Sequence, residues 1–443
     1  MSEVTLREVL RARDERARLQ NELINTYRCP IVSFTMNIAG PVKDTPAIRR
    51  AFGYGLSALL DRLPSESVLF SKSHSSVTGS EAMLAVSLDA GSIKRICTDI
   101  EESTPLGRLF DMDVIDRDGR KLERETERSC IVCGKAGREC AAGRLHSVEK
   151  LQSVTRRIIT EHFEQVDSEY LANVAIESLI KEVETTPKPG LVDRRNSGSH
   201  SDMDIFTFKK SANALKPYFL RCVEIGQTTS ALAPSETFDQ LRQEGILAEK
   251  TMYAATGGVN THKGAIYSMG VLLGALGRLW SVEEPIAELP RVFSGSAALV
   301  KSSVSSDFDK ASGSTAGERI YFERGLTGIR GEVASGFESV VRFSLPAYEN
   351  ALKKGLCEND AGVIALLHLI SEIEDTNLYH RGGEEGVRFA KAYAKKMLES
   401  PSMTEIEKMD DAFIERNLSP GGCADLLAIT YFLYILKKQT DRI

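Results

Sequence analysis

IVSFTMNI, residues 31–38, is the segment on which the fold assignment of the N-terminal half depends. Its β-branched and aromatic residues are interleaved with polar ones, a pattern typical of a strand. The Gly-Pro pair at 40–41 ends this strand, because both residues interrupt regular structure. Thr45-Pro46 then supplies the capping chemistry of a helix start, and apolar residues continue at helical spacing to Leu63.

The flanking segments extend this pattern into a small domain. A charged helical pattern runs up to Tyr27. Strand patterns follow at 67–75 and 82–89, then a helix at 92–102 and a strand at 109–115. The resulting order, β-α-β-β-α-β, predicts an N-terminal α+β domain with the ferredoxin-like arrangement.

The C-terminal half has a different character. From about Leu151 nearly every periodic segment predicts a helix, and strand-like alternation is almost absent. We therefore expect two domains, residues 1–158 (α+β) and 159–443 (all-α). The predicted helices cover residues 154–163, 170–182, 204–225, 238–255, 265–280, 286–302, 346–353, 362–373, 384–398 and 424–437.

Composition excludes several classes of protein. The chain has 443 residues, 42% of them hydrophobic and 27% charged, which argues against global disorder. A net charge of −6 makes general binding to nucleic acid or anionic membranes unfavourable. The charged N-terminus lacks the apolar core of a signal peptide, and no apolar stretch is long enough to span a bilayer. We expect a cytoplasmic protein without nucleic-acid or membrane partners, whose eight cysteines are reduced.

Three of those cysteines form a cluster with a histidine, in the spacing C-x2-C-x6-C-x5-H. Two thiolates separated by two residues can bind one ion, and a later Cys and His can complete a tetrahedral shell. The pattern predicts a structural zinc site, with reduced cysteines in a loop-rich segment as the alternative. The four candidate ligands are Cys130, Cys133, Cys140 and His146.

A D-x-D pair lies on the last predicted strand of the N-terminal domain. Asp111 and Asp113 share one face of that strand, because side chains alternate with period two. Such a pair can hold Mg2+ against a di- or triphosphate, with Arg108 beside it as a phosphate ligand. The alternative is a solvated strand face. The mixed-charge run at 120–128 is interpreted as a solvated hairpin or loop.

The loop at 186–204 is unusually rich in charge between two rigid prolines and a helix cap. Three cations and three acids exceed what a cap requires, so the loop predicts a polyphosphate and Mg2+ site; a capped surface loop is the alternative. The candidate residues are Lys188, Asp193, Arg194, Arg195, His200 and Asp202.

Three further polar, glycine-rich loops precede or join helices at 255–266, 375–383 and 417–425. Glycines and a helix N-terminus favour an anion, although the spacing of a Walker A loop is missing. Four such loops on a helical scaffold suggest one composite pocket. The candidates in these three loops are Gly257, Gly258, Asn260, His262, Lys263, Asp375, His380, Arg381 and Asp425.

Long motifs in both halves resemble known families. TPKPGLVDRRNSGSHSDMD (186–204), ATGGVNTHKGAIYSMG (255–270), DTNLYHRGG (375–383) and NLSPGGCADLLA (417–428) resemble the triphosphoribosyl-dephospho-CoA synthase of citrate lyase. SFTMNIAGPVKD (33–44), TGSEA (78–82), PLGRLFDMDV (105–114) and CIVCGKAGRECAAGRLHS (130–147) are similar to the holo-citrate lyase synthase. The whole chain resembles the fused bifunctional form.

This resemblance implies a bifunctional transferase acting in two steps. The C-terminal half, a pentosyltransferase, would join ATP and 3'-dephospho-CoA into 2'-(5''-triphosphoribosyl)-3'-dephospho-CoA and release adenine. The N-terminal half, a nucleotidyltransferase, would attach phosphoribosyl-dephospho-CoA to a serine of the citrate lyase acyl carrier (gamma) subunit and release pyrophosphate. Mg2+ is the implied cofactor.

The resemblance also suggests roles for the candidates. Asp193, Asp202 and Asp375 would bind metal or stabilise the ribosyl cation. His200 or His262 would move the proton. Asp111 and Asp113 would hold Mg2+, and phosphates or nucleotide would bind at Arg108, Lys188, Arg194, Arg195, Gly257, Gly258, Asn260, Lys263, His380, Arg381 and Asp425.

Three alternatives stay open from the sequence. The chain could serve malonate decarboxylase instead, could be a non-catalytic assembly module of the lyase, or could be an N-glycoside hydrolase that uses water as the acceptor. Incubation with ATP and dephospho-CoA tests the last two, since a scaffold would release no adenine and a hydrolase would release it from ATP alone.

Overall fold

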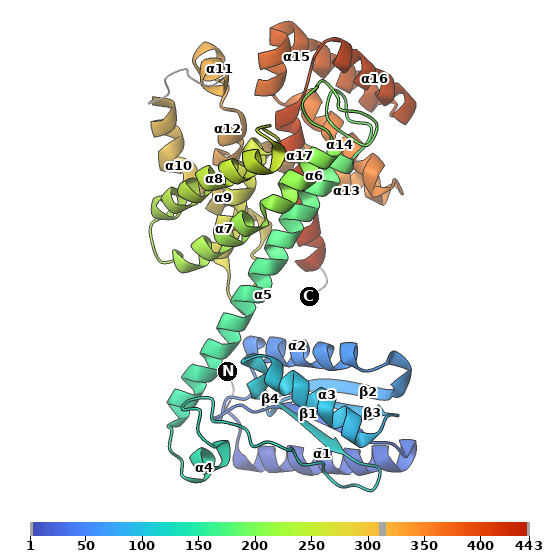
Figure 1. Ribbon diagram of the computed structural model, residues 1–443, viewed down its shortest axis with the longest axis vertical. Helices are drawn as coiled ribbons and strands as arrows, with labels where there is room; N and C mark the ends of the chain where they lie inside the picture. Colours follow the sequence, from blue (N-terminus) through green and yellow to red (C-terminus); the bar gives the residue numbers. More distant parts are fainter. Residues whose placement is uncertain (1–2, 310–315, 441–443) are drawn as a thin grey trace. The chain divides into compact units, whose positions relative to one another are not determined.

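The structure is a computed structural model that describes residues 3–309 and 316–440 (Figure 1). The chain divides into two compact units, Met1–Val166 (unit 1) and Asp167–Ile443 (unit 2). Unit 1 contains a small antiparallel sheet with helices, and the described part of unit 2 is helical, as the sequence predicts. Across the described ranges, no helix is both long and apolar enough to cross a membrane.

Unit 1 follows the predicted order of strands and helices. Its elements are α1 (Leu6–Tyr27), β1 (Ile31–Met36), α2 (Pro46–Arg62), a short 3-10 turn (Ser65–Ser67), β2 (Val68–Ser76), β3 (Gly79–Val86), α3 (Ala90–Ser103), a second 3-10 turn (Leu106–Leu109), β4 (Phe110–Ile115), α4 (Gly137–Ala142) and the first part of α5 (Val148–Glu184).

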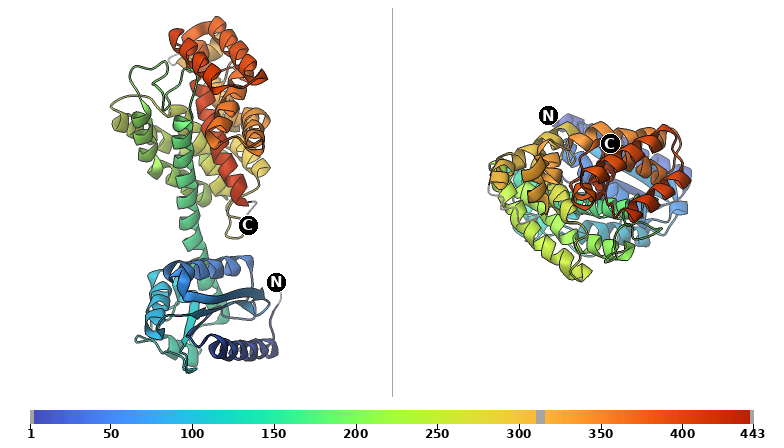
Figure 2. Two further views of the ribbon diagram at one scale, coloured as in Figure 1. Left: turned by 90° about the vertical axis from the view of Figure 1, so that its right-hand side faces the viewer. Right: turned by 90° about the horizontal axis from the view of Figure 1, so that it is seen from above.

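The sheet has the strand order β2-β3-β1-β4, and every neighbouring pair is antiparallel. The central strand β1 is covered on both faces. Ile31 belongs to a core cluster with Leu23 and Ile24 of α1. Phe34 stacks on Phe52 of α2, with ring centroids 4.6 Å apart. Helices thus cover both faces of the sheet, α1 on one and α2 and α3 on the other (Figure 2).

Local chemistry explains where these elements begin and end. The Thr45 hydroxyl accepts a hydrogen bond from the Ile48 backbone N–H at 3.2 Å, and Pro46 occupies the first helical turn of α2. The predicted N-terminal helix is confirmed as α1, which ends where Arg28 adopts a left-handed conformation.

Unit 2 is built on α5 and twelve further α-helices within the described ranges. They are α6 (Ile205–Ala214), α7 (Lys216–Thr228), α8 (Pro234–Thr256), α9 (Lys263–Leu279), α10 (Leu289–Asp309), α11 (Ala316–Arg324), α12 (Gly328–Ala334), α13 (Leu345–Lys353) after a π-helical turn (Val340–Ser344), α14 (Glu358–Glu372), α15 (Thr376–Glu399), α16 (Met403–Glu415) and α17 (Gly421–Thr440).

Three predicted helices are divided differently in the structure. The segments 154–163 and 170–182 belong to the single helix α5, because the six residues between them, EQVDSE, contain neither glycine nor proline. The predicted helix at 204–225 is instead α6 and α7, which meet at Leu215. Pro217 causes this division, since its ring has no N–H to donate to the preceding turn.

Helix α9 lies at the centre of unit 2, with 12 of its 17 residues buried. It packs closely on α7 through glycines. A Cβ added to Gly226 would lie 2.2 Å from the carbonyl oxygen of Gly274, and one added to Gly277 would lie 2.2 Å from that of Val223. This backbone contact fixes the axis of α9 and therefore the position of its N-terminus.

Candidate active sites

A cavity of about 710 Å³ in unit 2 is lined by residues of all four candidate loops. The loops are separated by tens to hundreds of residues in the chain, so their convergence is a property of the helical scaffold. Of the predicted residues, nine line this cavity: Lys188, His200, Asp202, Asn260, His262, Lys263, His380, Arg381 and Asp425.

His262 lies immediately before α9 and is buried. Its Nδ1 is 2.8 Å from the Ser211 hydroxyl, which also accepts a hydrogen bond from the Thr261 hydroxyl. Its Nε2 is buried and has no hydrogen-bond partner. Burial, with a smaller contribution from nearby Lys188, lowers the pKa of His262 to about 3. The imidazole that lines the cavity is therefore neutral at pH 7, and one of its nitrogens has no hydrogen-bond partner in the protein.

His200, the other candidate for proton transfer, has both ring nitrogens occupied. Arg381 donates to Nδ1 at 3.2 Å, so Nδ1 is the acceptor nitrogen and Nε2 carries the proton toward the Ser419 hydroxyl at 3.0 Å. Burial and the charge of Arg381 lower the pKa of His200. His200 therefore joins two of the loops, whereas the free nitrogen belongs to His262.

Lys188 is buried and forms an ion pair with Glu182 of α5. Burial raises the pKa of Glu182, and Lys188 opposes that rise. Sequence reasoning missed Glu182, because a single acid inside a long helix carries no motif. The Lys188 ammonium group therefore already has a protein partner, Glu182. The positive charge of Lys188 also lowers the pKa of His262.

Asp425 lies over the first turn of α9. A Cβ added to Gly264 would come within 1.9 Å of its carboxylate, so only glycine leaves room for that carboxylate. Burial, followed by the charges of Glu182 and Asp375, raises the pKa of Asp425 well above its ordinary value. This shift favours the protonated form of the Asp425 carboxyl, which lines the cavity.

The cations of the cavity differ in how freely they can reach a ligand. Lys263 is half exposed, and its ammonium group pairs with Glu249 at 3.0 Å. Arg381 donates to the Ser199 carbonyl and to the Asn417 side chain, each at 2.8 Å, and these bonds fix its guanidinium. The Asn260 side-chain oxygen accepts a hydrogen bond at 3.3 Å from the backbone N–H of Lys263, the first residue of α9.

Two predicted carboxylates lie outside the cavity and organise its loops. Asp193 accepts hydrogen bonds from the backbone N–H groups of Lys188 at 2.9 Å and Arg195 at 2.6 Å. Asp375 caps α15 and also accepts from the Cys423 N–H at 2.8 Å, which joins two of the loops. Their oxygens are used by the backbone, a role that residue type alone does not distinguish from metal binding.

Four other predicted residues also lie outside the lining. Arg195 pairs with Asp410 and Asp411 of α16, and Arg194 donates to Asn359 at 2.7 Å. Gly257 and Gly258 have positive φ and end α8.

The segment Leu326–Arg330, at the start of α12, also lines the cavity and was missed. Neither α11 nor α12 was predicted, so nothing in the sequence pointed to this fifth segment.

Unit 1 has its own cavity, of about 1050 Å³. Asp111 and Asp113 both line it, and burial alternates along β4 so that these two side chains share a face. Asp113 pairs with Lys121 at 2.7 Å. Burial, and then the charge of Asp113, raises the pKa of Asp111. The predicted Arg108 lines the same cavity and donates to Ser129.

The run at 120–128 is only partly the solvated loop that the sequence suggested. Arg124 and Arg128 line the cavity and both pair with Glu101, a carboxylate that is 1% exposed. Glu101 also accepts the Met112 backbone N–H at 2.7 Å. A buried acid thus holds two guanidinium groups beside the D-x-D pair, where they can bind phosphate oxygens. These arginines were not predicted as site residues because the acids around them make the run resemble a solvated surface loop.

The predicted zinc ligands are also brought together in unit 1. Ligand atoms of Cys130, Cys133, Cys140 and His146 all lie within 4.8 Å of one another. Over the residues that the structure describes, this is the one group of three or more His, Cys, Asp or Glu side chains with that spacing. All eight cysteines are free thiols.

Comparisons with known proteins divide the chain in the same two parts. Residues 168–442 match the family model described as ATP:dephospho-CoA triphosphoribosyl transferase. Residues 4–162 match the model described as apo-citrate lyase phosphoribosyl-dephospho-CoA transferase.

Curated relatives cover the chain both whole and in part. Protein CitXG of Haemophilus influenzae is 34% identical over 97% of this chain and 96% of its own length. Protein CitXG of Leuconostoc mesenteroides subsp. cremoris is 31% identical over 97% of both chains. The 2-(5''-triphosphoribosyl)-3'-dephosphocoenzyme-A synthase of Pectobacterium atrosepticum is 40% identical over 64% of this chain and 94% of its own. The chain therefore belongs to the family of fused, bifunctional citrate lyase prosthetic-group transferases.

Proposed function

We propose that unit 2 joins ATP to 3'-dephospho-CoA, giving 2'-(5''-triphosphoribosyl)-3'-dephospho-CoA and adenine. The observation that carries this proposal is the convergence of four loops on one cavity that contains a neutral His262 with a free Nε2. The family match over residues 168–442 supports the same reaction.

The proposed roles follow from the geometry. His262 Nε2 accepts the proton of the ribose 2'-hydroxyl as that oxygen attacks C1 of the ATP ribose. Asp425, whose pKa is raised by burial, serves as the acid that protonates the departing adenine. Lys263 and Arg381 bind the triphosphate, and the exposed Asp202 stabilises positive charge on the ribose.

We propose that unit 1 transfers the phosphoribosyl-dephospho-CoA group to a serine of the citrate lyase acyl carrier (gamma) subunit and releases pyrophosphate. Arg124, Arg128 and Arg108 line the cavity and would hold the triphosphate. Asp111 and Asp113 share a face and supply the carboxylate oxygens that Mg2+ uses beside phosphates, so the residues fit that ion. Bound Mg2+ would neutralise charge on the departing pyrophosphate.

In unit 2 no three carboxylate or histidine side chains among the described residues lie close enough to form a protein-only metal site. Mg2+ commonly binds through one or two carboxylates together with substrate phosphates. Asp202 would then be the protein ligand, and the triphosphate would supply the remaining oxygens.

The decisive experiment is mass spectrometry of a purified acyl carrier subunit after incubation with the full chain, ATP and dephospho-CoA. We expect the carrier to gain the mass of phosphoribosyl-dephospho-CoA and free adenine to accumulate. Adenine release from ATP without dephospho-CoA would indicate a hydrolase instead. If the chain modified the malonate decarboxylase carrier and not the citrate lyase carrier, the chain would be assigned to malonate decarboxylase instead.

We also propose that unit 1 has the ferredoxin-like arrangement. Its βαββαβ order and its antiparallel strand order β2-β3-β1-β4 support this assignment.

A further inference from the structure

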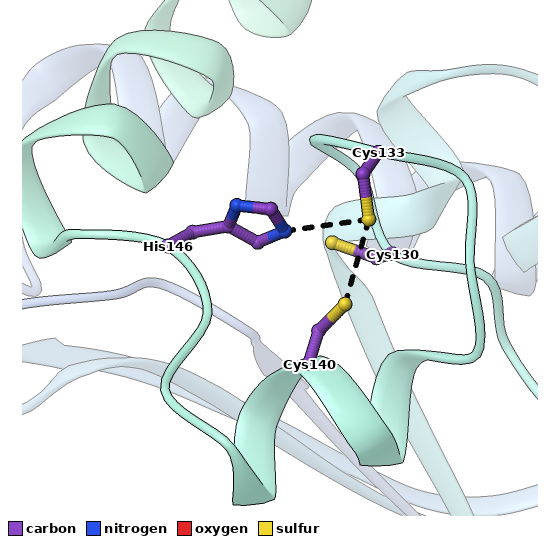
Figure 3. Close-up of side chains that lie close together, drawn as sticks. All are labelled: Cys130, Cys133, Cys140 and His146. Carbon is purple, nitrogen blue, oxygen red and sulfur yellow. Dashed lines mark hydrogen bonds between the residues drawn. The ribbon is translucent and has the colours of Figure 1, made fainter.

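Cys130, Cys133, Cys140 and His146, here the zinc-ligand group, point toward one centre in unit 1 (Figure 3). Cys133 Sγ lies 3.4 Å from Cys140 Sγ and 3.3 Å from His146 Nε2. In a tetrahedral zinc site, Zn–S bonds of about 2.3 Å separate two sulfurs by about 3.8 Å. The four ligand atoms therefore already have nearly the spacing that one ion requires.

The backbone around the first two cysteines is shaped as a tight turn. Gly134 adopts φ +73° and donates its N–H to the Cys130 carbonyl at 2.9 Å. The Val132 N–H donates to Cys130 Sγ at 3.4 Å. Backbone N–H groups that donate to sulfur stabilise a thiolate and orient it, as outer-shell partners do in metal sites.

The segment that carries the zinc-ligand group has almost no core of its own. Between residues 116 and 147 only Cys140 is buried, and the only helix is the six-residue α4. A segment this poor in buried apolar surface cannot be held in one conformation by the hydrophobic effect. A bound ion that joins its two ends supplies the missing stabilisation, as in small zinc domains.

The same segment forms one wall of the unit 1 cavity. Cys130, Cys140 and His146 line that cavity together with Arg138 and Arg144. We propose that the zinc-ligand group binds one structural Zn2+ ion, and that this ion fixes the wall from which arginines face the transferred group. Sulfur ligands select zinc over Mg2+, and four protein ligands leave no open position for catalysis. The second part of this inference, control of the cavity, rests on the proposed transferase function of unit 1.

Metal content tests the first part without any activity assay. We expect about one zinc per full-length chain by inductively coupled plasma mass spectrometry. Cys133→Ser should reduce this to about one tenth or less, whereas His146→Cys should retain zinc because a set of four cysteines also binds zinc. Cys357→Ser, an exposed cysteine of unit 2, is the matched control and should keep its zinc.

Cobalt provides a second readout. The chelator-stripped chain titrated with Co2+ should develop the visible absorption of a tetrahedral thiolate site, and Cys133→Ser should not. Zinc below about one tenth per chain with no cobalt spectrum, iron in place of zinc, or a Cys133–Cys140 disulfide in the purified protein would overturn the proposal.

Activity tests the second part. Cys133→Ser should lose at least about tenfold in carrier modification when supplied with the triphosphoribosyl intermediate, while adenine release by unit 2 stays within about twofold of wild type. His146→Cys, which should retain zinc, should keep most of the wild-type rate of carrier modification. A zinc-free Cys133→Ser protein that modifies the carrier at the wild-type rate would refute control of the cavity. If the wild-type chain binds zinc yet modifies no carrier, the transferase function fails and the zinc site stands.

Discussion

His262 differs from His200, the other candidate for proton transfer, in having a buried Nε2 without a hydrogen-bond partner. His262→Asn keeps an acceptor or donor at the position of Nδ1, toward Ser211, and removes Nε2. We expect adenine release to fall by about 10²- to 10⁴-fold, the usual contribution of a positioned general base. The rate of adenine release is measured by chromatography. His368→Gln, on α14 and outside the cavity lining, should change the rate by less than about twofold. Equal rates for the two variants would remove His262 from the reaction.

The same residue makes stability depend on pH. The unfolded chain binds a proton at His262 near pH 6.5, whereas the folded chain, with a pKa of about 3, does not. The contribution of neutral His262 to the free energy of unfolding is therefore fully present above pH 6.5. It is lost at up to about 1.4 kcal/mol per pH unit as the pH falls from 6.5 toward 3. His262→Asn should have a shallower dependence. Thermal melting of both proteins between pH 5 and 7.5 measures the difference, and parallel curves would contradict the prediction.

Glu101 holds two arginines of the unit 1 cavity in position. Glu101→Gln removes the charge that pairs with Arg124 and Arg128, so two guanidinium groups lose their buried partner. Breaking a buried pair costs about 3–5 kcal/mol. We expect a lower melting temperature for unit 1 and at least about tenfold slower carrier modification.

Glu102→Gln is the matched control for this variant. Its side chain is 47% exposed and lies 3.4 Å from Arg124, so we expect near wild-type stability and rate. Carrier modification by the two variants, measured with supplied intermediate, decides between them. The positioning role would be rejected if Glu101→Gln modified the carrier as fast as Glu102→Gln does.

At the scale of elements, the α7–α9 contact holds the N-terminus of α9 at the site. A Cβ at Gly226 would meet the Gly274 carbonyl oxygen at 2.2 Å, and backbone cannot yield as a flexible side chain does. We expect Gly226→Ala to cost about 1–3 kcal/mol in stability and to lower adenine release as well. Gly245→Ala on α8, where the nearest atom is 3.6 Å away, should be neutral or slightly stabilising. Denaturant unfolding of both proteins tests this, and a stable Gly226→Ala would contradict it.

Elements were predictable where local chemistry defines them. The Thr45-Pro46 cap and the strand at 31–36 depend on residues within a few positions, so periodicity and capping identified them. Two other features were predicted wrongly. Helix α5 is continuous because no glycine or proline interrupts it, and α6 and α7 are separate because Pro217 follows Leu215.

The loops were recognised, but not the role of each residue within them. Asp193 and Asp375 bond backbone N–H groups, whereas Asp425 lines the cavity, and nothing in the sequence separates these cases. Glu101 was missed because its partners Arg124 and Arg128 are brought to it only by tertiary packing, and Glu182 because a single acid inside a long helix carries no motif.

At the scale of the whole chain, each unit has a core and a cavity formed from its own residues. The two proposed reactions therefore use different side chains, and we expect a substitution in one cavity to leave the other intact. His262→Asn should block formation of the intermediate but not its transfer. Asp113→Ala should block transfer but not adenine release.

This independence predicts complementation between damaged chains. An equal mixture of the His262→Asn and Asp113→Ala proteins, given ATP and dephospho-CoA, should modify the acyl carrier, although neither protein does so alone. The physical reason is that the intermediate, released by the intact unit 2 of one chain, can diffuse to the intact unit 1 of another. Mass spectrometry of the carrier over time should show a lag that shortens as total protein rises. A mixture that leaves the carrier unmodified, while each variant keeps its own half-reaction, would mean that the intermediate never leaves the chain that makes it.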